Sequence, residues 1–220
     1  MFRLFCLTFF DRHPMIRFKD VSLSLGNKQL LKNFNLRIGK GDKVLLAAQS
    51  GSGKTSLLRL ILGFIDPDDG KILFNKKALT PENTQKIRRQ IAYLSQDVDF
   101  PNGKVSEVFQ EIFQFSANKH LPYSETMLRE KLLAFDLPES LLSKNTSVIS
   151  GGERQRLGWI LIQLLNRPVL LLDEPTSAMD EKQKQRFIDY VLKTKKTVVC
   201  VSHDPAWQIP EMKVITNFTP

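Results

Sequence analysis

The first clear pattern in this sequence is an alternation of apolar and polar residues over residues 16–25. A Gly-Asn turn follows, and strand-like sequence then continues as far as residue 38. A period of two is typical of strands with one buried face, so the N-terminal part predicts an antiparallel β portion. Further strands are expected at residues 71–74 and 91–95, with a short polar helix around residues 83–89 between them.

Three other segments are apolar almost throughout, at residues 44–48, 169–172 and 197–201. Short apolar runs bounded by turn residues are typical of strands buried on both faces of a parallel sheet. Helical spacing follows the first two of these runs, at residues 56–62 and 181–192. Buried strands that alternate with helices predict an α/β core with a mostly parallel sheet.

The middle of the chain has a different texture. Over residues 105–142 the apolar residues recur every three or four positions, which predicts helices. Because strand-like sequence precedes and follows this block, we expect a helical subdomain of about residues 97–157 inserted into the core. Residues 15–220 then form a single domain.

Residues 1–14 stand outside these patterns, because Met15 directly precedes the first alternating segment. One interpretation is that translation begins at Met15 and residues 1–14 are an upstream extension, while a start at Met1 stays open. Residues 2–10 are mostly apolar but are followed by charged residues and no small-residue cleavage site, so a truncated signal peptide is the weaker interpretation. No stretch approaches the roughly 18–20 apolar residues of a membrane span.

Composition adds one distinctive property to a chain of otherwise ordinary globular type. The 220 residues include 32 Lys and Arg against 23 Asp and Glu, a net charge of +9. This excess makes nucleic acid, anionic lipid and phosphorylated ligands all candidates for binding. The two cysteines, Cys6 and Cys200, cannot form a disulfide framework, and Cys200 lies in an apolar run where a buried thiol is expected. A reducing cytoplasm fits this cysteine usage best.

A phosphate-binding loop is predicted between the buried strand at residues 44–48 and the helix at residues 56–62. The sequence there is Ser-Gly-Ser-Gly-Lys-Thr, from Ser50 to Thr55. Glycines allow backbone N–H groups to converge on an anion, and the helix N-terminus adds its positive dipole end. Lys54 would contact the β and γ phosphates and the Thr55 hydroxyl would bind Mg²⁺. One position departs from the full pattern, which has glycine where this chain has Ala48.

Two acidic residues and a histidine complete the outline of a nucleoside triphosphatase. Asp173 and Glu174 follow the buried strand at residues 169–172, and ligands of open α/β sheets bind at such strand ends. Asp173 would hold Mg²⁺ through water, and Glu174 would act as the general base for the attacking water. His203, just beyond the next strand, would face the γ phosphate as a donor.

A second anion site is predicted at Ser150, Gly151, Gly152 and Glu153, which open another helix. A helix cap alone explains the serine but not the two glycines after it. Because one chain rarely needs two sites for a γ phosphate, we expect this segment to complete the nucleotide pocket of another subunit. Two chains would then pack head to tail as a homodimer, with two ATP molecules between them.

These residues together resemble the ATP-binding subunits of ABC transporters, over essentially residues 16–220. The resemblance implies a P-loop NTPase fold, ATP hydrolysis, a separately encoded integral membrane permease and a peripheral position on the cytoplasmic face of the inner membrane. It also implies that Gln96 contacts Mg²⁺ and the γ phosphate, and that residues 177–180 form the D-loop. The implied nucleotide-binding residues are Ala48, Gln49, Ser50, Gly51, Ser52, Gly53, Lys54, Thr55 and Ser56, with Ser150, Gly151, Gly152 and Glu153 acting in trans. The implied catalytic residues are Glu174, His203 and Gln96, and the implied Mg²⁺ residues are Thr55, Gln96 and Asp173.

Two features bear on what is bound and transported. The family usually has an aromatic residue that stacks on adenine where this chain has Leu25, so selection of ATP over GTP is less assured. Residues 135–145 are most similar to small bacterial ATP-binding subunits associated with iron or metal efflux.

Two other classes of function stay open. A soluble ABC-type ATPase acting on nucleic acid or ribosomes would use the positive charge, but such proteins generally have two ATPase domains or a long coiled coil. The basic residues here are scattered over helices and turns, so no nucleic acid is expected as a partner. A structural ATP-binding module without turnover would bind Mg-ATP but not hydrolyse it.

Overall fold

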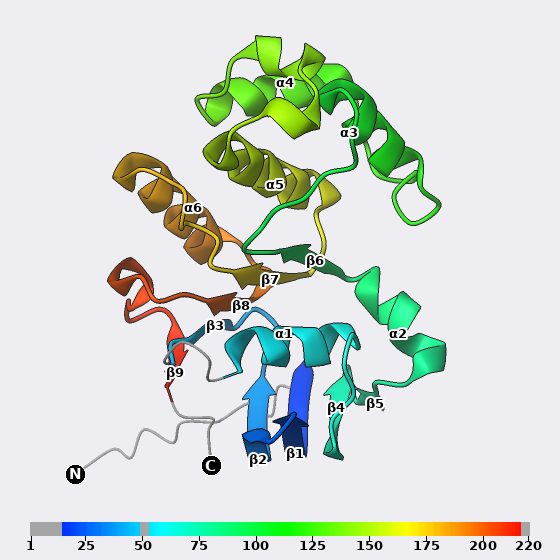
Figure 1. Ribbon diagram of the computed structural model, residues 1–220, viewed down its shortest axis with the longest axis vertical. Coiled ribbons are helices and arrows are strands. Elements are labelled where there is room, and N and C mark those ends of the chain that lie inside the picture. Colours follow the sequence, from blue (N-terminus) through cyan, green and yellow to red (C-terminus); the bar gives the residue numbers. More distant parts are fainter. Residues whose placement is uncertain (1–14, 49–52, 217–220) are drawn as a thin grey trace, which may run out of the picture.

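The computed structural model describes residues 15–48 and 53–216 (Figure 1). Their strands form two sheets, one with strand order β2-β1-β4-β5 and the other with order β6-β7-β8-β3-β9. The strands are β1 Ile16–Leu25, β2 Lys28–Ile38, β3 Lys43–Leu46, β4 Asp69–Phe74, β5 Lys77–Ala78, β6 Ile91–Leu94, β7 Val169–Asp173, β8 Thr197–Val201 and β9 Lys213–Ile215.

The first sheet confirms the antiparallel portion predicted at the N-terminus. β1 pairs with β2 and with β4, both in antiparallel register. Ile16 and Phe18 are buried in alternation, and a register shift after Phe18 moves the next buried pair to Val21 and Leu23. The ring of Phe18 packs edge-on against Phe34 of β2, at 5.5 Å between ring centres. One face of this sheet is therefore committed to the core.

The second sheet is parallel at every strand pair that the described residues form. All five residues of β7 and all five of β8 are buried, which confirms the interpretation of these apolar runs as strands covered on both sides. β3 ends at Leu46, two residues earlier than predicted. β9 was not predicted, because its three residues carry no clear pattern and it lies at the edge of the sheet beside β3.

The helices cover the core on several sides. They are α1 Lys54–Leu62, α2 Pro81–Arg88, α3 Val105–Gln114, α4 Glu125–Ala134, α5 Gly151–Leu165 and α6 Glu181–Lys193, with the 3₁₀ turns η1 Glu139–Ser143, η2 Thr146–Val148 and η3 Pro205–Trp207. The helical block expected at residues 105–142 therefore consists of α3, α4 and η1. Residues 115–124 break it, because Pro122 cannot continue a helix and the Asn118 side chain donates a hydrogen bond to the Ile112 carbonyl.

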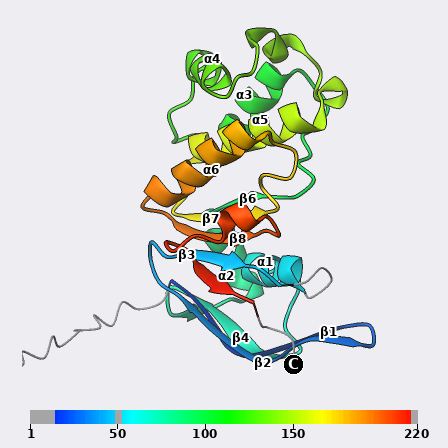
Figure 2. The ribbon, with the colours of Figure 1, turned by 90° about the vertical axis from the view of Figure 1, so that its left-hand side faces the viewer.

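The parallel sheet separates two hydrophobic clusters. Leu171 and Val199 face the antiparallel sheet and α1, whereas Leu170, Leu172 and Val198 face α5 and α6. Figure 2 shows the resulting layers, with the antiparallel sheet at one end of the molecule and α3 and α4 at the other. No helix of the described residues has the length and apolar character needed to cross a bilayer.

Helix α5 packs unusually close to strand β6 and the segment after it. A Cβ atom added at Gly158 of α5 would lie 2.7 Å from the Leu94 Cδ1 atom and 3.0 Å from Val98 Cγ1. The side chains of Leu94 and Val98 would have to shift to admit any side chain at Gly158. Glycine therefore allows α5 to pack closely against these two side chains.

Candidate active site

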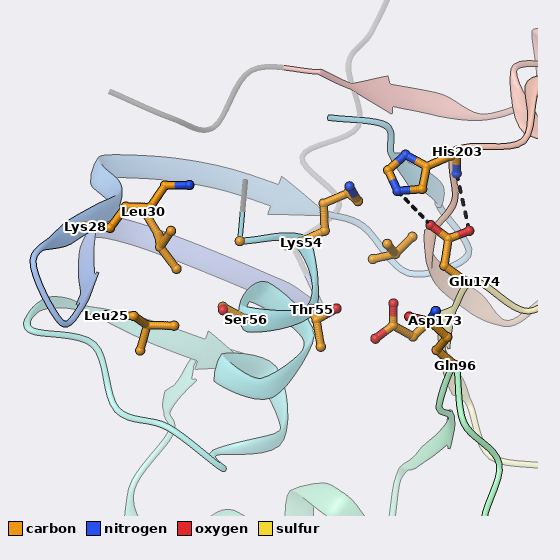
Figure 3. Close-up of a pocket in the computed structure, with 12 residues that line it drawn as sticks. Leu25, Lys28, Leu30, Lys54, Thr55, Ser56, Gln96, Asp173, Glu174 and His203 are labelled. Atoms are coloured by element: carbon orange, nitrogen blue, oxygen red, sulfur yellow. Dashed lines mark hydrogen bonds and ion pairs between the residues drawn. The ribbon is translucent and has the colours of Figure 1, made fainter. Parts of the chain in front are cut away.

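A pocket of about 400 Å³ lies at the carboxyl ends of the parallel strands. Its lining joins four parts of the chain: the start of α1, the ends of β7 and β8, the segment after β6, and the hairpin between β1 and β2. The lining residues are Leu25, Lys28, Leu30, Gly53, Lys54, Thr55, Ser56, Gln96, Asp173, Glu174, Val201 and His203. Figure 3 shows Leu25, Lys28 and Leu30 at one end of this pocket and Glu174 and His203 at the other. Open α/β sheets bind ligands at this edge.

The start of α1 supplies a buried cation of the pocket, Lys54. Gly53 caps the helix with a φ of 91°, a conformation that L side chains rarely adopt, and Leu30 lies against it. The Lys54 ammonium donates a hydrogen bond of 2.6 Å to the Ala48 carbonyl, and burial lowers the pKa of Lys54. Ala48 does not have a positive φ, so alanine is accommodated there without backbone strain. The predicted loop residues Gln49, Ser50, Gly51 and Ser52 lie outside the described residues.

Asp173 is the deepest carboxylate in the pocket, at 3% exposure. Burial raises its pKa, and hydrogen bonds from Thr55 and Tyr93 oppose that rise. The Tyr93 hydroxyl donates to Asp173 Oδ2 at 3.5 Å, and burial raises the pKa of Tyr93 to about 12. Among the described residues Asp173 Oδ1 has no hydrogen-bond partner. Buried oxygen atoms are rarely left in this state, so Oδ1 is available for a ligand.

Glu174 and His203 meet at the ends of adjacent strands. Nε2 of His203 lies 3.2 Å from Oε1 of Glu174, and the His203 backbone N–H donates to Oε2 at 3.4 Å (Figure 3). The Glu174 side chain is 15% exposed and that of His203 is 51% exposed. Glu174 has a φ of 45°, which is unfavourable for a residue other than glycine. Its carboxylate is therefore held at the edge of the pocket by the surrounding structure.

The segment from Ser150 to Glu153 does not line this pocket. Ser150 caps α5 in a capping box, in which Glu153 N–H donates to Ser150 Oγ at 3.2 Å and Ser150 N–H donates to Glu153 Oε2 at 2.8 Å. The Ser150 side chain thus accepts from the Glu153 N–H and also hydrogen-bonds to the Glu153 carboxylate. Ser150 and Gly151 are exposed, and a Cβ added at Gly151 would meet nothing within 4 Å.

Comparison with known proteins identifies the family to which the chain belongs. A family model described as ABC transporter matches residues 31–177, which is more than half of the chain. The chain belongs to the ABC transporter family. It is an ATP-binding transporter ATPase.

Two relatives illustrate the range of this ABC family. The probable iron export ATP-binding protein FetA of Escherichia coli strain K12 is 31% identical over 198 residues, covering 88% of this chain and 87% of the relative. The energy-coupling factor transporter ATP-binding protein EcfA1 of Staphylococcus aureus strain USA300 is 30% identical over 203 residues, covering 88% and 74%.

Solved structures agree with the fold. The ATP-binding cassette MJ0796, as a dimer in a post-hydrolysis state with ADP and Pi, superposes with a TM-score of 0.74 at 25% identity, covering 92% of this chain and 94% of that one. A bacterial Atm1-family ABC exporter with ATP bound gives a TM-score of 0.78 over 92% of this chain and 37% of the exporter. At 19% identity the exporter shows the fold alone.

Gln96 lines two cavities of this ABC ATPase. It is exposed, two residues after the end of β6, and lines the pocket at the strand ends. It also lines a second cavity of about 400 Å³, together with Gly151, Gln155 and Ala178. The predicted residues thus fall into two groups, one in the nucleotide pocket and one at the start of α5, with Gln96 between them. Their individual roles stay predictions.

Several residues in or near the pocket of the ABC ATPase were missed by sequence reasoning, among them Tyr93 and Leu30. Tyr93 of β6 pairs in register with Leu171 of β7. Its position three residues before Gln96 was the sequence feature that could have indicated a place near the pocket. Leu30 lies in the strand-like sequence, and it lines the pocket only because the hairpin of β1 and β2 folds beside it. Gln155 lies in residues 149–155, which resemble the signature segment of the family, but its burial and its contact with the Glu174 carbonyl were not predicted.

Proposed function

We propose that this chain is the ATP-hydrolysing subunit of a membrane ABC transporter, that it acts as a head-to-tail homodimer, and that a separately encoded permease carries the cargo. The observation that carries the proposal is the separation of the two anion-binding segments. The nucleotide pocket of one chain contains Lys54 and Glu174, whereas Ser150 and Gly151 stand exposed outside it. A second copy would supply them to the open side of the pocket.

The residues of the pocket divide the work of hydrolysis. Lys54 and the N-terminus of α1 bind the phosphates, which bear most of the negative charge of the substrate. The Glu174 carboxylate accepts the proton of the attacking water, and His203 donates a hydrogen bond to the γ phosphate. Ser150 of the partner subunit donates its hydroxyl to the same phosphate. Leu25 and Leu30 contact the base.

The pocket also suits Mg²⁺. Asp173 Oδ1 is a buried carboxylate oxygen without a hydrogen-bond partner among the described residues, and Thr55 and Gln96 add oxygen atoms nearby. Oxygen ligands of this kind, completed by water and substrate phosphates, are what Mg²⁺ prefers. Thr55, Gln96 and Asp173, the last through water, would hold the ion, which would neutralise charge on the β and γ phosphates. Removal of Mg²⁺ with EDTA should stop hydrolysis, and added Mg²⁺ should restore it.

Mixing two inactive variants tests the head-to-tail arrangement. Lys54→Ala removes the phosphate cation, and Gly151→Glu places a carboxylate where the partner's nucleotide would bind. A Cβ added at Gly151 has nothing within 4 Å among the described residues, so Gly151→Glu should fold normally. Each variant alone should lose hydrolysis. A mixed dimer has one intact site, so an equal mixture should recover about a quarter of wild-type activity. An inactive mixture that still forms dimers by light scattering would rule out composite sites.

Glu174→Gln tests the catalytic assignment. The variant should bind ATP but lose hydrolysis by about a hundredfold or more, because the amide cannot accept a proton. It should also accumulate as a dimer in Mg-ATP during size-exclusion chromatography, since closed sites are no longer emptied. Hydrolysis by Glu174→Gln at the wild-type rate would contradict the assignment of Glu174 as the general base.

The partner and location follow from the proposed transporter. We infer a peripheral position on the cytoplasmic face of the inner membrane, where the net charge of +9 is compatible with anionic lipid. Affinity purification of tagged chain from native membranes should retain a multi-span membrane protein. Salt-sensitive binding of purified chain to RNA or DNA would instead favour the nucleic-acid function.

Iron or another metal is the cargo that we propose. The support is the 31% identity to FetA, whose name describes probable iron export. Cells that lack the gene should accumulate iron under iron load, as measured by elemental analysis. Wild-type chain should reverse this accumulation and the Glu174→Gln variant should not. An unchanged iron content would exclude iron as cargo and leave the ATPase assignment untouched.

A further inference from the structure

Gln155 of α5 is buried at 3% exposure, and within residues 15–48 and 53–216 its side-chain amide bonds only to the loop that follows β7. Nε2 donates to the Glu174 carbonyl at 3.0 Å and to Ser177 Oγ at 3.5 Å. Oε1 accepts from the Ala178 N–H at 3.0 Å. One side chain thus forms hydrogen bonds with three residues of the segment 174–178.

This contact bears on Glu174 because the backbone there is in an unfavourable conformation. A non-glycine residue with a φ of 45° persists only where its surroundings hold it. The Glu174 N–H donates to the Val201 carbonyl at 2.9 Å, which fixes the amide side. On the carbonyl side, Ser177 N–H donates from within the loop at 3.3 Å and Gln155 donates from outside it. Gln155 is therefore the anchor that relates Glu174 to α5.

Helix α5 is a suitable support for such an anchor. Its first turn presents Ser150, and Gly152 approaches the loop so closely that an added Cβ would lie 3.2 Å from the Ala178 carbonyl oxygen. Further along, Gly158 holds the helix against β6. A displacement of the first turn of α5 is therefore transmitted directly to the loop that contains Glu174.

We propose that Gln155 is a positioning residue for hydrolysis, which sets the direction of the Glu174 carboxylate through the hydrogen bond to the Glu174 carbonyl. This positioning role depends only on the ATPase activity. A further consequence rests on the proposed head-to-tail dimer: when Ser150 contacts the partner's nucleotide, the effect of that contact on Glu174 would pass through α5 and Gln155.

The test compares Gln155→Met, which keeps the volume but loses both bonding functions, with wild type. We expect kcat to fall about tenfold or more, which corresponds to about 1.4 kcal/mol per factor of ten, while KM for ATP changes less than about threefold. Gln163→Leu is the matched control. Gln163 lies on the same helix and accepts a hydrogen bond from Lys131 at 2.9 Å, but it is remote from the nucleotide pocket. Its removal should leave kcat unchanged.

The variant Gln155→Glu distinguishes positioning of Glu174 from a general contribution of Gln155 to the fold. Its carboxylate can still accept from Ala178 N–H but opposes the Glu174 carbonyl oxygen, whereas the protonated acid can donate to that oxygen. On protein that stays fully folded by circular dichroism over this range, the ratio of variant to wild-type kcat should therefore rise as the pH falls from about 8 to about 6. This ratio also decides the matter if Gln155→Met fails to fold.

Two results would overturn the proposal: kcat of folded Gln155→Met within twofold of wild type, or a Gln155→Glu ratio that does not change with pH. Failure of the dimer model would show elsewhere, as an inactive mixture of Lys54→Ala and Gly151→Glu.

Discussion

The imidazole of His203 lies beside the carboxylate of Glu174, with Nε2 3.2 Å from Oε1. The two residues come from separate strand ends, and the 51% exposure of His203 leaves its ring open to a ligand. The histidine can thus contact a bound phosphate while it restricts the carboxylate.

Replacement of this histidine should impair turnover more than binding. We expect His203→Ala to lower kcat about a hundredfold, because a donor aimed at developing charge is lost. KM for ATP should change only a few-fold. His120→Ala, at an exposed position after α3, is the control and should keep full activity. Equal kcat values for His203→Ala and wild type would show that His203 has no catalytic role.

The base end of the pocket predicts a gain of affinity. Leu25 is 50% exposed and lines the pocket, but an aliphatic side chain cannot stack on a purine as a ring does. Leu25→Tyr should lower KM for ATP roughly two- to tenfold, the equivalent of about 0.5–1.5 kcal/mol. Leu133→Tyr, at an exposed position of α4, should have no effect. An unchanged KM for Leu25→Tyr would place the base elsewhere.

The capping box at α5 predicts a pH-dependent contribution to stability. The backbone hydrogen bond from Ser150 is the largest cause that lowers the pKa of Glu153. The folded state therefore favours the ionised carboxylate, so its stabilisation is present above the ordinary pKa of about 4.3 and is lost as pH falls through the lower folded value.

Glu153→Gln should accordingly reduce the free energy of unfolding by about 1 kcal/mol at pH 7. The difference from wild type should shrink in urea titrations repeated below about pH 4. Glu130→Gln, an exposed residue of α4, serves as the control. A difference that stayed constant with pH would show that ionisation of Glu153 contributes nothing.

Cys200 should be chemically silent in the folded protein. It is fully buried in β8, and burial raises the pKa of its thiol well above the usual value. In a Cys6→Ser variant Cys200 is the single thiol of the chain. Its reaction with Ellman's reagent at pH 8 should be on the order of a hundredfold slower than in urea. Comparable rates with and without urea would mean that β8 opens readily.

Sequence patterns predicted the parts of this structure that depend on local order. β7 and β8 were recognisable as uninterrupted apolar runs, and the acids after β7 marked the edge where ligands bind. β9 was not recognisable, because three residues at a sheet edge leave no period to detect. The contact of Tyr93 with Asp173 and that of Gln155 with Glu174 depend on how β6 and α5 pack against β7, which no spacing within either segment records.

The close approach at Gly158 also sets a mechanical limit on the helical region. Helix α5 lies against Leu94 and Val98 on the sheet side. Elsewhere on the same helix, Gln163 accepts a hydrogen bond from Lys131 of α4, and Arg156 donates to the carbonyls of Phe135 and Asp136. A rotation of α4 relative to the sheet would therefore have to carry α5 with it or break these contacts, which makes α5 the mechanical link between the parallel sheet and α4.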